Sequence, residues 1–455
     1  MSPRKRRPAR PAGQDNEEGE LSSDPNFIPE PDTGEEDFRD VKLSYHVVRK
    51  KGRFPGISPF QVRLLQGILS SVLERRTPLD RAYAQWFSRV KLDPHEQGFL
   101  IRQVNAMFSH LSFYARAAGL RRPWDLKNHV NRLIICYCAH KKLRLPELDA
   151  GEGFERGSLA SRIEQAEDDI LMREGCPLWL NELCTPLLGD EWPEIRASLA
   201  LEAPRYIRAN TLKAGRDALA SELSSEGVIT KHVKDAPDAL EVVSSSAIFR
   251  TQAYRQGHFE QQDAGSQEIA PFLLPEPGMR VIDACAGSGG KTLHLSALMQ
   301  AKGSIIALDT AQHKLDDLKA RARRAGAHNV ETRLADTTKV VKRLYDSADR
   351  VLIDAPCSAT GILRRTPDLK WTDIRDRLPG LLETQQGLLS RLSRTVRPGG
   401  LIVYSTCSIL PQENGQQVRR FVEGSGGDFE LEAERSVSPA SMRDGFYMAR
   451  IRRVR

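Results

Sequence analysis

The sequence lacks any apolar run long enough to cross a membrane, and its amino terminus lacks the apolar core of a secretory signal. A spanning helix needs about 20 apolar residues, whereas MSPRKRRPARPAG leads into polar sequence. The seven cysteines are odd in number and contain no Cys-x-x-Cys pair, which argues against a disulfide framework and against a zinc or other metal site. These absences indicate a cytoplasmic, reducing compartment. In a eukaryote, the RKRR segment would favour the nucleus or nucleolus.

Charge is unevenly distributed along the 455 residues. The first 40 residues hold six Lys/Arg and eleven Asp/Glu, so the remainder carries +12 within a total of +7. Such an excess suggests a polyanionic partner, which for a soluble protein is usually nucleic acid. A basic surface that serves solubility alone has the same composition.

The chain is long enough for several domains. Residues 1–50 are poor in large apolar side chains and predict a disordered tail. Residues 51–150 repeat apolar residues at helical spacing and predict an all-α domain, whose basic residues form either a nucleic-acid face or a solvated surface. Residues 160–255 mix short strand-like and helical segments, which predicts a small α+β subdomain.

Residues 256–455 alternate strand-like and helical segments, which predicts an α/β fold with a parallel, doubly wound Rossmann-like sheet. Two final strand-like segments, FELEAE and GFYMARIRR, follow each other without a helix and predict an antiparallel pair at one edge. Ligands of such sheets bind beyond the carboxyl ends of the strands.

A glycine-rich turn, VIDACAGSGGKT, joins a predicted strand to a predicted helix. Gly287, Gly289 and Gly290 let the backbone approach a ligand, and the helix start offers free N–H groups. The end of the turn, GGKT, resembles a phosphate-binding P-loop. The first glycine of that pattern falls on Cys285, however, so a P-loop is disfavoured.

Three successive predicted strands each deliver a carboxylate to the same sheet edge: Asp309, Asp336 and Asp354. Asp309 follows the glycine turn by about twenty residues, where an acid is placed to accept hydrogen bonds from ribose hydroxyls. The pyrophosphate of a dinucleotide is disfavoured beside this negative charge. The pattern therefore favours an adenosine ligand without a polyphosphate.

Two cysteines, Cys357 and Cys407, lie just past predicted buried strands, in the loops APCS and STCS. Free cysteine has a pKa of about 8.5, so a thiol becomes a better nucleophile where its pKa is lowered. The edge of a ligand crevice suits such activation. Four other cysteines are better explained as small buried apolar side chains: Cys136, Cys138, Cys176 and Cys184.

The sequence resembles the RsmB-type (RsmB/NOP/NSUN) RNA cytosine-5 methyltransferases over about residues 175–455. The matching segments are DACAGSGGKT, DAPCSATGILRRTPDLKW, YSTCSILPQEN, RANTLK, GHFEQQDAGSQEIAPFL and DGFYMARIRR. The helical region more loosely resembles the NusB-like RNA-binding domain of bacterial members. One departure is Gly287-Ser288, where the family usually has Ala-Pro.

The resemblance implies a class I methyltransferase fold, S-adenosyl-L-methionine as cofactor, and methylation of C5 of a cytosine in RNA. Cys407 would be the nucleophile that attacks C6 of the base, and Cys357 would assist proton loss and product release. Asp354 would contact the cytosine, and Lys291 would add positive potential near the reacting centre. The implied cofactor-binding residues are Cys285, Ala286, Gly287, Ser288, Gly289, Gly290, Lys291, Asp309, Asp336 and Asp354.

The expected substrate is a 16S-type ribosomal RNA, with transfer RNA as an alternative, and the expected assembly is a monomer that does not bind membranes. Two other functions remain open at this point. One is an RNA-binding ribosome-assembly factor with a degenerate methyltransferase pocket, supported by the Gly287-Ser288 departure. The other is a dinucleotide oxidoreductase, which the absence of a Gly-x-Gly-x-x-Gly spacing disfavours.

Overall fold

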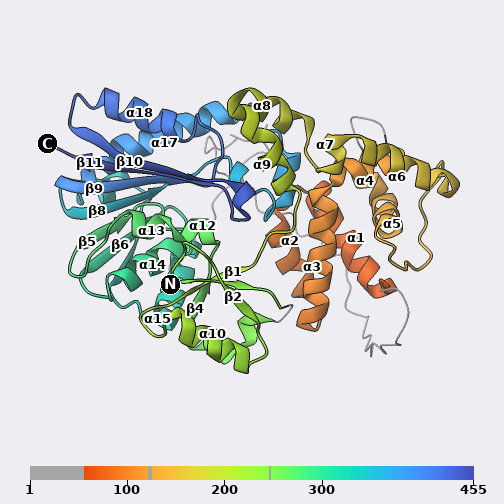
Figure 1. Ribbon diagram of the computed structural model, residues 1–455, viewed down its shortest axis with the longest axis horizontal. Coiled ribbons are helices and arrows are strands. Elements are labelled where there is room, and N and C mark those ends of the chain that lie inside the picture. The colour runs from red at the N-terminus through yellow and green to blue at the C-terminus, as the bar shows by residue number, and fades with distance from the viewer. Residues whose placement is uncertain (1–55, 121–124, 245–246) are drawn as a thin grey trace, which may run out of the picture. The chain divides into compact units, whose positions relative to one another are not determined.

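The computed structural model describes residues 56–120, 125–244 and 247–455 (Figure 1). The predicted disordered tail, residues 1–50, lies outside these residues. The helical prediction for the following region is confirmed. Its helices are α1 (Pro59–Leu73), α2 (Leu79–Phe87), α3 (Pro94–Ser109), α4 (Leu111–Ala117) and α5 (Val130–His140).

Local sequence explains where α1 begins. The Ser58 hydroxyl accepts a hydrogen bond from the Gln61 N–H at 3.2 Å, and the Gln61 side chain accepts one from the Ser58 N–H at 3.0 Å. This reciprocal cap satisfies two backbone donors, and Pro59 fits the first turn because it has no N–H to satisfy. The apolar face of the helix, including Leu65 and Ile68, is fully buried.

Four further helices follow before the first strand: α6 (Leu159–Asp168), α7 (Ile170–Arg173), α8 (Leu178–Leu188) and α9 (Trp192–Leu199). Ala166 of α6 is buried in the same apolar cluster as α1 to α5. Helix α6 therefore packs with the amino-terminal helices, although it lies beyond residue 150. The predicted domain boundaries themselves stay predictions.

A small antiparallel sheet comes next, with the strand order β2-β3-β1-β4. Helix α10 (Arg216–Ser225) buries Leu219 and Leu223 in the apolar cluster that this sheet shares. The strands are β1 (Tyr206–Ala209), β2 (Thr230–His232), β3 (Ala239–Val242) and β4 (Phe259–Gln261).

The carboxyl-terminal half forms a seven-stranded sheet in the order β10-β11-β9-β8-β5-β6-β7 (Figure 1). The five strands from β9 to β7 are parallel, and β11 and β10 are antiparallel at one edge. The doubly wound sheet and its antiparallel edge pair are thus confirmed. The strands are β5 (Arg280–Asp283), β6 (Ser304–Asp309), β7 (Val330–Leu334), β8 (Ala348–Asp354), β9 (Val396–Thr406), β10 (Phe429–Val437) and β11 (Phe446–Arg453).

Alternate residues of these strands enter two apolar layers. Val281 packs with the layer that includes α13 (Ile269–Phe272) and α14 (Gly290–Leu298). Ile282 packs with the layer that includes α17 (Leu378–Leu392) and α18 (Gly415–Gly424). Figure 1 shows α17 and α18 on one side of the sheet and α13 and α14 on the other. Because both faces are covered, the central strands carry continuous apolar segments, such as Ile305 to Leu308 of β6 and Val351 to Ile353 of β8.

Strand β5 lies between β6 and β8, so the chain leaves β5 toward one edge and later returns on its other side. The carboxyl ends of the strands beside such a reversal form a crevice for ligands. The loops after β5, β6, β8 and β9 all belong to this end of the sheet. No helix in the described ranges is long and apolar enough to cross a bilayer.

Candidate active site

Two loops at the carboxyl ends of β8 and β9 carry the two cysteines singled out from the sequence. The strands are parallel neighbours, with Asp354 opposite Ser405. The sulfur atoms of Cys357 and Cys407 lie 3.3 Å apart, and both residues are partly exposed. Sequence reasoning placed these thiols at one sheet edge, and the structure brings them into direct contact.

The surroundings of Cys357 favour its protonated form. The hydrogen bond with Cys407, followed by burial, raises the pKa of the Cys357 thiol well above its ordinary value. Burial also raises the pKa of each cysteine assigned to the core to about 12, so these four thiols are inert at neutral pH. They are Cys136, Cys138, Cys176 and Cys184, all buried as expected.

An ion pair lies beside the thiols. The Lys291 ammonium is 2.6 Å from one carboxylate oxygen of Asp354, and the Ser405 hydroxyl donates to the other at 2.8 Å. Burial lowers the pKa of Lys291, but the charge and hydrogen bond of Asp354 more than offset this, so the pKa is raised. The negative potential of the Cys407 sulfur also favours the charged lysine. Lys291 therefore stays cationic next to the sulfur.

The glycine turn after β5 is held from the end of β6. One oxygen of Asp309 accepts the Gly287 N–H and the other accepts the Ala311 N–H, each at 2.8 Å. Gly287 has a φ of 53° and Gly289 one of 89°, conformations that glycine adopts without strain. A Cβ on Gly289 would lie 2.1 Å from Leu318, so this position also needs glycine for space.

Two other predicted cofactor residues, Cys285 and Asp336, lie in different surroundings. Burial, followed by the fields of Asp283, Asp354 and Asp309, raises the pKa of the Cys285 thiol, so this cysteine is not a thiolate. Asp336 lies two residues past the end of β7 and is exposed. The third strand therefore ends before the acid that was expected to close it.

Sequence reasoning missed a group of charged residues that brace the glycine turn. The guanidinium of Arg321 donates to the Ser288 carbonyl at 2.6 Å, and that of Arg208 donates to the Gly290 carbonyl at 2.8 Å. Glu260, which is 3% exposed, accepts from Arg321 at 2.8 Å. Arg208 belongs to the RANTLK segment. That segment entered the sequence analysis only as a point of resemblance, without a role.

Comparison with known proteins accords with this geometry. The family described as 16S rRNA methyltransferase RsmB/F matches residues 270–452, and a ferredoxin-like domain of RsmF/B-like methyltransferases matches residues 176–248. Ribosomal RNA small subunit methyltransferase B of Klebsiella pneumoniae (strain 342) is 32% identical over 311 residues, which are 66% of this chain and 70% of that protein. The chain belongs to the RsmB/F methyltransferase family.

Solved structures share the fold. PH0851 superposes with a TM-score of 0.74 at 23% identity and covers 88% of this chain and 100% of its own. NSun6 from Pyrococcus horikoshii, solved with SFG, has a TM-score of 0.56 at 22% identity and covers 61% of this chain and 98% of its own. As an RsmB/F family member, the chain is an RNA (cytosine-5)-methyltransferase that depends on S-adenosylmethionine.

The glycine turn fits this cofactor. A Cβ built on Gly287 or Gly290 would meet no atom within 4 Å, so open space faces the turn. Helix α14 begins at this turn, so its first N–H groups lack acceptors within the helix, and the Asp309 oxygens keep lone pairs for ribose hydroxyls. A small zwitterionic nucleoside therefore has both donors and acceptors here. Sequence reasoning identified each of these residues.

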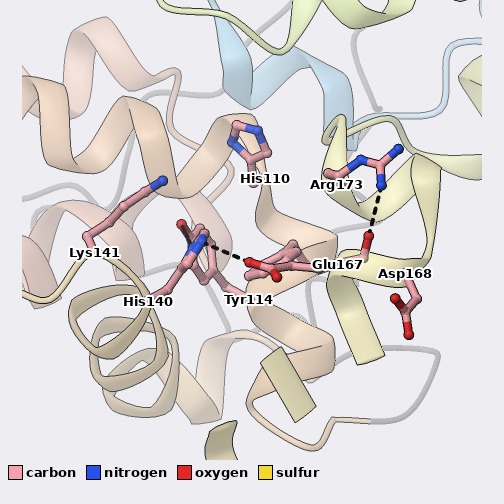
Figure 2. A pocket seen from close by; sticks show the side chains of 8 residues that line it. His110, Tyr114, His140, Lys141, Glu167, Asp168 and Arg173 are labelled. Carbon is pink, nitrogen blue, oxygen red and sulfur yellow. Dashed lines mark hydrogen bonds and ion pairs between the residues drawn. The ribbon is translucent and has the colours of Figure 1, made fainter. Parts of the chain in front are cut away.

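A separate pocket of about 430 Å³ lies in the helical region (Figure 2). Within it the Tyr114 hydroxyl lies 3.1 Å from the ring Nδ1 of His140, whose Nε2 lies 3.5 Å from Glu167. The lining carries two cations and two carboxylates, so its charge selects neither an anion nor a cation. The lining residues, none of which the sequence analysis named as a site residue, are His110, Phe113, Tyr114, His140, Lys141, Glu167, Asp168 and Arg173.

Proposed function

We propose that the protein methylates C5 of a cytosine in 16S-type ribosomal RNA through a covalent bond between Cys407 and C6 of the base. The 3.3 Å contact of the two thiols carries this proposal. Cys357 and Cys407 lie in the loops that follow two adjacent parallel strands, β8 and β9. The names of the curated relatives support the ribosomal substrate.

The Cys407 thiolate would add to C6, forming a sulfur–carbon bond and moving the C5=C6 electron pair onto C5. This step makes C5 nucleophilic, which an unmodified cytosine ring is not. When bound, S-adenosylmethionine supplies the electrophilic methyl group. Transfer of the C5 proton to a base in the solvent then lets the carbon–hydrogen bonding pair re-form the C5=C6 bond, and the sulfur–carbon pair leaves with the Cys407 sulfur to restore the thiolate.

Cys357 would assist proton loss and release of the product. Its sulfur is within hydrogen-bond range of the Cys407 sulfur, so it lies beside the bond that must break. A thiol with a raised pKa does not compete as a nucleophile in the first step. One thiol thus forms the covalent bond and the other helps to break it.

Asp354 and Lys291 would orient the base. Ser405 and Lys291 fix the Asp354 carboxylate, which would contact the exocyclic amine and N3 of the cytosine. The Lys291 cation would stabilise negative charge that develops near the thiols.

Asp309 and the loop 285–291 would hold the cofactor, together with Asp336. The target base has to leave its stack to enter the crevice.

Two cysteine variants test the mechanism. Cys407→Ala is expected to abolish methyl transfer to RNA, and Cys357→Ala is expected to accumulate a protein–RNA adduct that survives denaturing electrophoresis. The double variant, which lacks the nucleophile, is the matched control and forms no adduct. Full activity of Cys407→Ala would overturn the covalent mechanism.

A separate experiment identifies the RNA. Bisulfite sequencing of total RNA from a strain that lacks the gene is expected to show one 16S cytosine that is no longer protected. Loss of protection in a transfer RNA instead would replace the ribosomal assignment.

Calorimetry with S-adenosylmethionine tests the alternative function, because an assembly factor with a degenerate pocket would not bind this cofactor. The proposed site of action is the cytoplasm.

A further inference from the structure

A fully buried carboxylate lies behind the two thiols. Glu413 follows β9, precedes α18, and is 0% exposed. An ionised carboxylate is costly to bury unless hydrogen bonds replace its water shell. The described residues provide four donors to its two oxygens, so the cost is largely offset.

The donors belong to the segments that carry the cysteines. One oxygen of Glu413 accepts the backbone N–H of Ser358 at 2.8 Å and the side-chain amide of Gln385 at 2.9 Å. The other accepts the hydroxyl of Ser408 at 2.5 Å and the hydroxyl of Ser358. Ser358 directly follows Cys357, and Ser408 directly follows the other thiol. One carboxylate therefore joins the residues next to both sulfurs.

The sheet does not fix this separation by itself. The last paired residues of β8 and β9 are Asp354 and Ser405, and the Ala355 N–H still donates to the Ser405 carbonyl at 2.8 Å. The next backbone bond between the loops runs from the Gly361 N–H to the Cys407 carbonyl at 2.9 Å. The residues between these two bonds include Cys357. Side chains must hold this part of its loop against its neighbour.

We propose that Glu413 is a positioning residue that fixes the distance between the Cys357 and Cys407 thiols. The inference rests on the proposed two-thiol function. Glu413 has no hydrogen bond to either sulfur and acts through the two serines. Its own backbone is anchored, because the Tyr404 hydroxyl donates to the Glu413 carbonyl at 2.7 Å.

Two substitutions separate position from charge. Glu413→Ala removes both carboxylate oxygens that accept these four hydrogen bonds, so the two loops lose the group that binds both of them. Glu413→Gln keeps the amide oxygen for the Ser358 N–H and the Gln385 amide, while its NH₂ group faces hydroxyls that can rotate to accept. The glutamine variant is therefore expected to hold the loops in place. Glu423→Ala, an exposed position on α18, is the matched control.

The first measurement needs no RNA. The effective concentration of one thiol toward the other is obtained from the glutathione-dependent equilibrium of the Cys357–Cys407 disulfide, mapped by peptide mass spectrometry. Glu413→Ala is expected to lower this concentration roughly tenfold or more. Glu413→Gln and Glu423→Ala are expected to stay within about threefold of the parent, since proximity depends on position. An unchanged value in folded Glu413→Ala would overturn the proposal.

The second measurement is methyl transfer by the full-length enzyme. Glu413→Ala is expected to lower kcat about 100-fold, because displacement of reacting groups by about 1 Å costs this much. The KM for S-adenosylmethionine should not change, because the donors to the Glu413 carboxylate, Ser358, Gln385 and Ser408, all lie outside the glycine turn. Glu413→Gln should recover most of the rate. If Glu413→Gln is as inactive as Glu413→Ala while the effective concentration of its two thiols is that of the parent, the charge of Glu413 matters and the positional role is overturned.

One outcome would contradict the proposed function but not the positioning role of Glu413. If the thiol proximity falls in Glu413→Ala while methylation continues at the parental rate, Glu413 positions the thiols but the two-thiol reaction is wrong. If Glu413→Ala does not fold, Ser408→Ala replaces it, since it removes one anchor and leaves the carboxylate with three donors. Parental thiol proximity in that variant would count against the proposal.

Discussion

A buried lysine offers a quantitative test of the packing between the helical region and the sheet. Lys370 belongs to the short helical turn η6 (Pro367–Trp371) and is 1% exposed. Its ammonium donates to the Leu199 carbonyl at 2.8 Å and to the Ser109 carbonyl at 3.4 Å. No carboxylate is among these partners. Burial lowers the pKa of Lys370 from 10.5 to about 8, while the nearby Cys176 slightly opposes the shift.

The shift makes stability depend on pH in a known direction. Below pH 8, Lys370 is protonated in both states, and the folded state bears the full cost of the buried charge. Between pH 8 and 10.5 the folded protein has lost the proton while the unfolded chain keeps it, so stability rises with pH. Each pKa unit corresponds to about 1.4 kcal/mol, which gives a total gain of about 3 kcal/mol.

Lys370→Met isolates this contribution. The variant lacks the titrating group, so the free energy of unfolding of the parent should rise by about 3 kcal/mol relative to the variant between pH 7.5 and 10.5. Urea unfolding at several pH values measures the difference. Cys176, whose pKa is raised to about 12, and His110, whose pKa is lowered to about 4, are present in both proteins, so their own contributions to the pH dependence cancel to first order in the difference. A pH-independent difference would refute the reasoning.

Three further substitutions probe the crevice. Gly361→Ala would place a Cβ 2.2 Å from the Gly445 carbonyl oxygen, so thermal unfolding should show a loss of about 1–3 kcal/mol together with reduced methyl transfer. Asp309→Ala removes the acceptor of two backbone N–H groups, and calorimetry should show S-adenosylmethionine affinity lowered on the order of 100-fold, with an unchanged Kd as the contrary result. Lys291→Met should lower the free energy of unfolding by about 2 kcal/mol, because it leaves Asp354 without its cation. Urea unfolding of the double variant with Asp354→Asn should show that part of this loss is recovered if the pair is coupled.

Much of the catalytic half was predictable because its signals are local. The alternation of apolar strands with amphipathic helices predicted the doubly wound sheet, and the two final strands without an intervening helix predicted the antiparallel edge. The glycine turn and Asp309 were predictable from their spacing, since the hydrogen bond from the Gly287 N–H to the Asp309 carboxylate joins the ends of two adjacent strands. The sequence predicted that the third strand extends to Asp336, two residues beyond its end at Leu334, because element boundaries carry a weaker signal than their centres.

What the sequence alone determined is thus the set of elements, the edge at which the loops emerge, and the residue types in each loop. Only the tertiary structure decided which of these side chains touch. The 3.3 Å contact between the thiols, the Glu413 anchor behind them and the burial of Lys370 join residues that lie far apart in the chain or in different elements. Local periodicity fixes a residue's face on its own element. Strand order and the paths of loops decide what that face meets.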